Sequence, residues 1–379
     1  MKPIIFWTSL IIILIVCAEI GSWAFFGFYG KQRLIYHERV DNKAFINDVL
    51  NASPESYEKL ANETIISWSN SFQSANSIEN KNVYGVSRPT PYSSDNILIS
   101  TYGDSFTYCQ DVKDSETWQY YLSQNTDSKA LNYGVKGYGT GQALLKLMER
   151  LKAGHKTRIV ILGILSENIA RVVNLNNKYY WSTGSYRNFK PALVKDGASY
   201  KWVGDYIKRL SYKEGRLEAI NAVEQYDFWY SQNKYRPKIG FPYLISAVDT
   251  IRYFLFYVKR WPDLWQDKNA VDIMRHILDN FYKLSKKHKF IPVILFIPHG
   301  YDLKRKEKGL ETSYARFKNE IKKENGGKFD LVIDASQGDY DSSKFHLKPY
   351  VGHASAFGNR WIAKAVYSEL EDKLKSDEP

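Results

Sequence analysis

The chain has 379 residues, 44% of them apolar, which suits one large domain with an insertion or two domains. Its formal net charge is +12, but Lys and Arg are spread along the chain and do not form a basic block interleaved with aromatic residues, so nucleic acid is not a predicted partner. The two cysteines and seven scattered histidines show no metal-ligand spacing, and neither a metal nor a cofactor is predicted. Aromatic residues reach 15%, which suits sugar stacking, an interface, a membrane-facing surface or the packing of an insertion.

The N-terminal segment Pro3–Phe28 is nearly all apolar and contains one charged residue, Glu19. A helix of this length rises roughly 39 Å, which is enough to span a bilayer. A cleaved signal peptide is the alternative, because Val16-Cys17-Ala18 resembles a small-residue cleavage site. The apolar run continues beyond that site, so we predict an uncleaved anchor over residues 1–30.

Residues 31–95 are polar and form a lead segment, with one or two helices expected in Leu34–Leu60 and a loop in Ser74–Asp95. From residue 96 the pattern changes to apolar strands alternating with helices. The expected strands are Ile97–Ser100, Ala130–Asn132, Arg158–Leu162, Phe290–Phe296 and Leu331–Ile333. The expected helices are Glu116–Ser123, Thr140–Leu151, Glu311–Lys323 and Ala356–Leu374. This alternation predicts an α/β fold over 96–379, with helices on both faces of a parallel sheet.

More than one hundred residues, 174–287, separate the third and fourth strands, which is too long for a simple crossover. The segment opens with an aromatic loop that includes Tyr179-Tyr180-Trp181, Tyr186, Phe189, Tyr200 and Trp202. Helices are expected near Lys213–Tyr230, Leu244–Trp261 and Val271–Lys286. We interpret the insertion as a lid beside the functional site, with a purely structural insertion as the alternative.

Ser105 stands where the first strand ends and the chain turns, in Thr101-Tyr102-Gly103-Asp104-Ser105. Ligands bind at the carboxyl ends of strands in open α/β sheets, so a hydroxyl there is well placed to be a nucleophile. A turn without function is the alternative.

Three later segments offer partners for this hydroxyl. The glycine-rich run Leu131–Gly141 follows a strand and opens a helix, but Gln142 replaces the third glycine of a dinucleotide motif and no Gly-Lys-Ser/Thr occurs. Asn168 ends the third strand, and its side-chain amide could donate to an oxyanion or cap a helix. His353 precedes the last helix and could serve as a base.

In this order, the segments resemble the four blocks of the SGNH, or GDSL, hydrolase family, from Gly103 to Gly358. The resemblance implies a three-layer α/β/α sandwich. It also implies that Ser105 is the nucleophile and His353 the general base, with Gly137, Asn168 and the Ser105 N–H holding the oxyanion.

Two positions depart from the family pattern. Asn168 is followed by Ile169 rather than Asp, and Tyr350 stands three residues before His353, where the family carries its acid. Asp339 or Asp341 could supply the missing carboxylate, or a Ser–His dyad could work with a carbonyl. The remaining candidate bases are His299 and His346.

The resemblance implies acyl-ester chemistry, since many extracytoplasmic members of the family act on acetylated glycans. We therefore predict an esterase for O-acetyl or other acyl esters, with a polysaccharide O-acetyltransferase and a non-catalytic glycan-binding or assembly protein as alternatives. The expected partners are an acylated glycan and, through the N-terminal helix, a membrane. A single-pass protein with its domain outside the cytoplasm is expected, although Lys31, Arg33 and Arg39 by themselves favour the opposite orientation.

Overall fold

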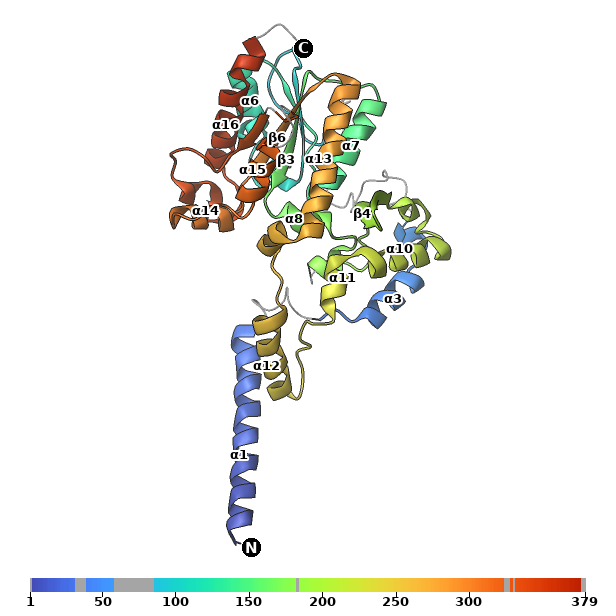
Figure 1. Ribbon diagram of the computed structural model, residues 1–379, viewed down its shortest axis with the longest axis vertical. Coiled ribbons are helices and arrows are strands. Elements are labelled where there is room, and N and C mark those ends of the chain that lie inside the picture. The colour runs from blue at the N-terminus through green and yellow to red at the C-terminus, as the bar shows by residue number, and fades with distance from the viewer. Residues whose placement is uncertain are drawn as a thin grey trace. The chain divides into compact units, whose positions relative to one another are not determined.

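The computed structural model describes residues 2–30, 39–57, 85–181, 184–323, 328–329 and 331–375. The predicted loop Ser74–Asp95 and the predicted helical region Leu34–Leu60 lie partly outside the described residues. The chain forms two compact units, which are described separately (Figure 1). The first, called the helical unit, comprises Met1–Glu58, Asn174–Phe189 and Arg209–Arg260. The second, called the sheet unit, comprises Lys59–Val173, Lys190–Lys208 and Trp261–Pro379.

The sheet unit is built on a five-stranded parallel sheet in the order β2-β1-β3-β6-β7. Its strands are β1 (Ile99–Tyr102), β2 (Ala130–Asn132), β3 (Ile159–Leu165), β6 (Ile291–Ile297) and β7 (Leu331–Asp334). Every residue of β3 is buried, as expected for a strand covered on both faces. The α/β class and all five predicted strands are confirmed.

Helices cover both faces of this sheet (Figure 1). On one face, α6 (Trp118–Thr126) and α16 (Ala356–Lys375) share an apolar core with side chains of the strands. On the other face lie α7 (Thr140–Lys152) and α13 (Lys268–His288). The sequence pattern predicts α13 as part of the insertion, but the helix buries apolar side chains at helical spacing and returns the chain to β6, so it is the crossover helix.

Shorter helical elements lie between the strands and the longer helices. These are α5 (Ser105–Tyr108), the 3₁₀ turn Asp114–Glu116, α8 (Asn168–Val172), the 3₁₀ helix Trp261–Gln266, α14 (Gly300–Glu307) and α15 (Ala315–Lys323). Two hairpins were not predicted, β4 (Ala192–Asp196) with β5 (Ser199–Val203) and β8 (His346–Lys348) with β9 (Val351–Ala354). The β8–β9 hairpin leads directly into α16, so the segment before the last helix is held by strand pairing.

The strand order places a topological switch point between β1 and β3. From β1 the chain moves outward to β2 and then returns to the other side of β1 to form β3. Crossovers leave in opposite directions at such a point, and the crevice between them is the usual ligand site of an open α/β sheet. Gly103 follows β1 there, and an added Cβ would lie 2.0 Å from Thr107 Oγ1 and 2.9 Å from the carbonyl oxygen of Gly163. Only glycine fits this turn.

The helical unit contains α1 (Lys2–Phe25), a π-helical turn Phe26–Gly30, α3 (Asn42–Asn51), α9 (Asn177–Tyr180), α10 (Lys213–Tyr226), α11 (Phe228–Asn233), α12 (Tyr243–Arg252) and a second π-helical turn Tyr253–Tyr257. The single helix predicted over Lys213–Tyr230 is broken at Asp227. Its carboxylate accepts the N–H groups of Leu175, Asn176 and Tyr230, and this role as a cap ends one helix and starts the next.

Much of the aromatic loop forms the core of the helical unit. Phe45 is fully buried, with ring centroids 5.2 Å from Tyr179 and 6.2 Å from Phe189. Tyr179 and Phe189 are buried as well. These contacts agree with the structural reading of the aromatic residues, and a role of the insertion as a lid stays a prediction.

The N-terminal helix of the same unit is long enough and apolar enough over Pro3–Phe28 to cross a membrane. An N-terminal signal sequence would have the same length and composition. The apolar side chains of this helix are largely exposed, including Ile4, Ile12 and Trp23.

Candidate active site

Ser105 is the first residue of α5, directly after the tight turn at the end of β1. Asp104 caps this short helix, because its Oδ1 accepts the N–H of Phe106 at 2.9 Å. The side chain of Ser105 is 6% exposed, so its hydroxyl lies in a largely enclosed position at the switch point. The local sequence explains this placement, since an apolar strand, a glycine and a capping aspartate follow one another.

His353 lies on β9 and reaches Ser105 across the sheet unit. Its Nε2 atom is 3.0 Å from Ser105 Oγ, although 248 residues separate the two in the sequence. The imidazole also packs beside Phe106, with ring centroids 5.2 Å apart. The structure therefore brings together the two residues predicted as nucleophile and base.

Asp111 contacts the other nitrogen of this imidazole and was not among the sequence candidates. Its Oδ2 atom is 2.7 Å from His353 Nδ1. Asp111 belongs to the loop after α5, six residues after Ser105, and has a left-handed backbone with φ of 72°. Aspartate is one of the few residues that tolerates this conformation. This left-handed backbone after Ser105 is visible only in the structure, so the sequence carried no signal for the contact of Asp111 with His353.

The carboxylates proposed from the sequence lie elsewhere. Asp341 caps a 3₁₀ turn, Ser342–Lys344, and forms an ion pair with Lys344 at 3.2 Å. Asp339 is an exposed residue in the loop after β7. His353 Nδ1 is instead paired with Asp111, which belongs to the loop after α5 and not to the loop before the histidine.

The two alternative histidines have other environments. His299 caps α14, where its Nδ1 accepts the N–H of Tyr301 at 3.2 Å. His346 on β8 is buried, and burial, together with the neighbouring His299 and His353, lowers its pKa to about 3. Of the three histidines, His353 is the one whose ring nitrogen contacts Ser105.

The predicted oxyanion donors occupy the two loops that flank this turn. Asn168 is fully buried at the start of α8, and neither its Nδ2 nor its Oδ1 has a hydrogen-bond partner among the residues that the structure describes. A buried amide without a partner is costly, and such a group often awaits a ligand. Gly137 lies in the loop after β2 with φ of 79°, a conformation that favours glycine. That loop abuts the nucleophile turn, because the N–H of Val135 donates to Gly103 O at 3.0 Å.

Arg171 on α8 links all three loops, and no sequence pattern indicates this role. Its guanidinium donates to the carbonyl oxygen of Tyr138 at 2.9 Å and pairs with Glu167 at 3.2 Å. It also lies 3.6 Å from the carboxylate of Asp104. Both Asp104 and Arg171 are buried, and burial raises the pKa of the Asp104 carboxyl whereas Arg171 lowers it. These three partners of Arg171 adjoin predicted site residues in the sequence. Asp104 precedes Ser105, Tyr138 follows Gly137, and Glu167 precedes Asn168.

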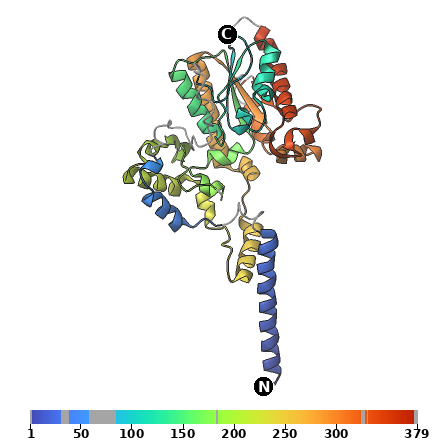
Figure 2. The ribbon, with the colours of Figure 1, turned by 180° about the vertical axis from the view of Figure 1, so that it is seen from behind.

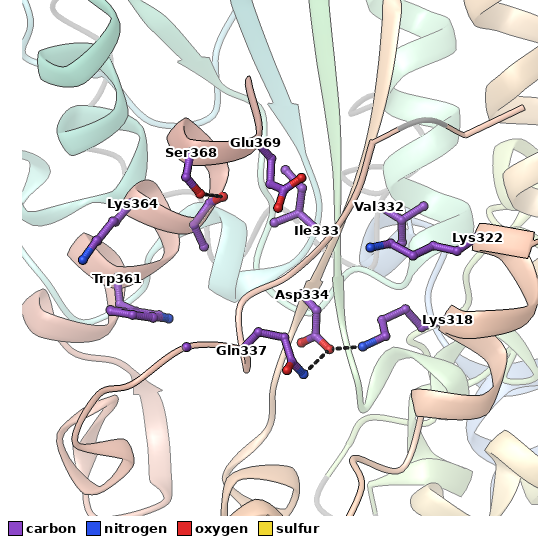
Figure 3. Close-up of a pocket in the computed structure, with 12 residues that line it drawn as sticks. Lys318, Lys322, Val332, Ile333, Asp334, Gln337, Trp361, Lys364, Ser368 and Glu369 are labelled. Atoms are coloured by element: carbon purple, nitrogen blue, oxygen red, sulfur yellow. Dashed lines mark hydrogen bonds and ion pairs between the residues drawn. The ribbon is translucent and has the colours of Figure 1, made fainter. Parts of the chain in front are cut away.

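A separate cavity of about 310 Å³ lies between α15, β7 and α16 (Figure 3). Lys318 and Asp334 form an ion pair inside it at 2.6 Å, and Gln337 donates to the same carboxylate. None of Ser105, His353 and Asp111 lines this cavity. The cavity is separate from these three residues, so we assign it no part in the site. Among the described residues, no group of three or more His, Cys, Asp or Glu side chains could hold a metal.

Comparison with known proteins identifies structural neighbours but no sequence relatives. The sequence matches no family model and no curated protein. One similar structure is a protein of the lipolytic G-D-S-L family from Desulfitobacterium hafniense, with 13% identity and a TM-score of 0.36 over 73% of this chain and 100% of that one. TesA has 11% identity and a TM-score of 0.34 over 73% and 98%. A second lipolytic G-D-S-L protein, from Veillonella parvula, has 10% identity and a TM-score of 0.26 over 72% and 97%.

The chemistry of the site follows from its own side chains. A carboxylate that accepts a hydrogen bond from Nδ1 of a neutral imidazole leaves the lone pair of Nε2 facing the serine hydroxyl. The order Asp111–His353–Ser105 is therefore suited to withdraw a proton from Ser105 Oγ. Such a serine attacks an electrophilic carbonyl carbon.

Proposed function

We propose that the protein is a serine esterase of the SGNH type, with Ser105 as nucleophile and His353 as general base. The observation that carries the proposal is the continuous contact from Asp111 through His353 to Ser105, at 2.7 and 3.0 Å. The non-catalytic alternative drew its support from the absence of an acid before His353. Asp111 occupies that role from a different loop, which favours catalysis.

In the first half-reaction, Ser105 Oγ attacks the ester carbonyl and its proton passes to His353 Nε2. The negative charge of the tetrahedral intermediate falls on the former carbonyl oxygen. Donors placed there before the reaction stabilise the charge without reorganisation. We assign this role to the Asn168 amide and to the N–H groups of Gly137 and Ser105. The unpartnered Asn168 amide supports that assignment.

The intermediate collapses when the ester C–O bond breaks and His353 returns its proton to the leaving alcohol. An acyl group then remains on Ser105 Oγ. In the second half-reaction a water molecule, deprotonated by His353, attacks the carbonyl carbon of this acyl-enzyme. The bond from that carbon to Ser105 Oγ then breaks, His353 returns the proton to Ser105 Oγ, and the acid is released. A sugar hydroxyl in place of the water would give acyl transfer by the same steps.

We further propose that the substrate is an O-acetyl ester of a glycan and that α1 anchors the protein in a membrane, with the sheet unit outside the cytoplasm. The substrate class rests on the family resemblance of the four motifs. The anchor is supported by the length and composition of Pro3–Phe28.

A fluorophosphonate probe tests the enzyme proposal, because it labels only an activated serine. The wild-type protein should be labelled, and Ser105→Ala should lose labelling together with at least about 10³-fold of its rate on p-nitrophenyl acetate. Ser199→Ala, which changes the exposed serine at the start of β5, is the matched control. Equal labelling of all three proteins, or of none, would exclude the proposal. Product analysis with an added soluble glycan then separates hydrolysis from transfer.

A further inference from the structure

The helix α12 of the helical unit carries an exposed apolar stripe. From Phe241 to Leu255 its apolar residues and those of the flanking turns recur every three or four positions, which is the spacing of one side of a helix, and Phe256 follows directly. The stripe consists of Phe241, Ile245, Val248, Ile251, Leu255 and Phe256, whose exposed fractions run from 58% to 81%. Contiguous exposure of this kind on a protein surface marks a site of interaction with another molecule or with a membrane. The opposite side of α12, with Ser246, Thr250 and Tyr253, is buried.

The stripe lies beside the apolar N-terminal helix. Figures 1 and 2 show α12 next to the end of α1 that is farther from the N-terminus. Between α11 and α12 the chain turns at a tip and returns as α12 (Figures 1 and 2), and Phe241 and Pro242 directly precede that helix. The rings of Phe26 and Tyr243 lie 6.4 Å apart between centroids. The helix α12 therefore packs against α1, whose apolar side chains are largely exposed.

Glu19, the one charged residue within Pro3–Phe28, holds the start of α12. Its two carboxylate oxygens accept the N–H groups of Tyr243 and Leu244 at 2.6 and 2.7 Å. The residue at the cap position of α12 is Pro242, which offers no side-chain hydrogen bond. In hydrocarbon both a carboxylate and the free N–H groups of a helix start are costly, and here each satisfies the other. The presence of Glu19 in an otherwise apolar segment is thus explained by its contact with the start of α12.

The depth of this contact can be estimated from the helix rise. Glu19 lies 17 residues after Lys2 and six before Phe25, which corresponds to about 26 Å and about 9 Å along α1. If α1 spans a hydrocarbon layer of about 30 Å, the start of α12 lies inside that layer. Asp249 comes six residues, about 9 Å, after Tyr243, which raises it to the level where α1 ends. The charged Asp249 and Arg252 then lie at the interface, where such side chains are tolerated.

We propose that Phe241–Tyr257 is a re-entrant membrane element, which enters the same bilayer leaflet as the C-terminal end of α1 and turns its apolar stripe to the lipid acyl chains. Phe241, at the tip, lies deepest. Exposed basic residues stand on both sides of the element, Lys238 before it and Lys259 and Arg260 after it, where they meet lipid head groups. The protein would then contact the membrane with two helices rather than one.

The test uses the full chain in phospholipid vesicles, with single cysteines that carry a polarity-sensitive NBD fluorophore. The background is Cys17→Ser, since Cys17 is exposed and Cys109 is buried. The labels replace Phe241 and Val248 in the stripe. Leu217 on α10, an apolar residue 42% exposed in the same unit, is the matched control. We expect nitroxides on the lipid acyl chains to quench the two stripe labels at least threefold more than the control label, and aqueous iodide to quench mainly the control.

Two results would overturn the proposal. If iodide quenches all three labels equally and acyl-chain nitroxides do not distinguish them, the stripe faces water. If the stripe labels are shielded from iodide and from nitroxide alike, protein covers the stripe, as in a dimer of this chain. Neither result bears on the labelling of Ser105, so the esterase proposal stands or falls separately.

Discussion

Asp104 in the sheet unit and Glu19 in the helical unit both accept backbone N–H groups at the start of a helix. Asp104 caps α5 from the position directly before it, where capping residues are found in most helices. Glu19 caps α12 from 224 residues away in the sequence. The first contact follows from local sequence, whereas the second exists only because two distant helices pack together. The same carboxylate chemistry therefore serves a local turn in one unit and a long-range contact in the other.

Among the changes considered, replacement of Arg171, the buried cation next to Asp104, should have the largest effect on stability. Replacing it by methionine, Arg171→Met, leaves a buried carboxylate without its partner and should cost about 3–5 kcal/mol of the free energy of unfolding. The labelling rate of Ser105 should fall as well, since Asp104 holds the turn. Arg171→Lys, which keeps the charge, should recover part of both losses.

The helical unit offers the matched control for that change. Arg209 pairs with Glu218 at 2.6 Å, but both side chains are about half exposed. Arg209→Met should therefore cost less than about 1 kcal/mol. Thermal unfolding of the detergent-solubilised chains measures both variants. Equal shifts for Arg171→Met and Arg209→Met would contradict the role assigned to the buried network.

Replacement of Asp111, which contacts His353, should have the next largest effect. Asp111→Asn should lower the rate of ester hydrolysis by about 10²-fold, because the amide no longer selects the imidazole tautomer that accepts the serine proton. The Asp111 side chain is half exposed, so water replaces part of its effect. Asp341→Asn, at the acid expected from the sequence, should leave the rate near the wild-type value. A larger loss in Asp341→Asn than in Asp111→Asn would show that the contact with His353 is not used.

A pH effect is expected from the buried His346, whose pKa falls from 6.5 in the unfolded chain to about 3 in the folded one. Only the unfolded chain binds the proton between these values, so stability is full above pH 6.5 and is lost as the pH falls toward 3. The loss should be about 2 kcal/mol between pH 6.5 and 5. His346→Leu should remove this part of the pH dependence. Urea unfolding midpoints of the wild type and of His346→Leu, measured at several pH values, provide the comparison. If the midpoint changes with pH equally in both proteins, the role assigned to His346 is wrong.

The smallest effect is expected from replacing Glu19, which caps α12 from a distant part of the chain. Glu19→Leu should weaken the start of α12 by about 1 kcal/mol, within the range of lost N-caps. The NBD label at position 241 should then become less accessible to acyl-chain nitroxides, while the rate of ester hydrolysis stays unchanged. Glu19→Gln keeps an acceptor oxygen, so the accessibility of its label to nitroxides should lie between that of the wild type and that of Glu19→Leu. An unchanged label in Glu19→Leu would mean that packing alone positions α12.

Much of the sheet unit could be predicted from the sequence because its signals are local. Short apolar runs separated by amphipathic helices specify a parallel sheet, and all five strands were found. Ser105 and His353 could be proposed because a nucleophile turn and a loop before the last helix have recognisable neighbours. The insertion was harder, since α13 has the same amphipathic pattern whether it covers the sheet or belongs to a separate unit. Its place was decided by the packing of its buried face.

The sequence by itself determined which side chains end up at the carboxyl edge of the sheet, because the ends of the strands follow from patterns a few residues long. It also determined that the N-terminus is long and apolar enough for a membrane. The tertiary structure decided which carboxylate meets His353, which cation meets Asp104, and which helix start meets Glu19. Each of these pairs joins segments far apart in the chain, and their contacts depend on backbone turns and packing that no local pattern specifies.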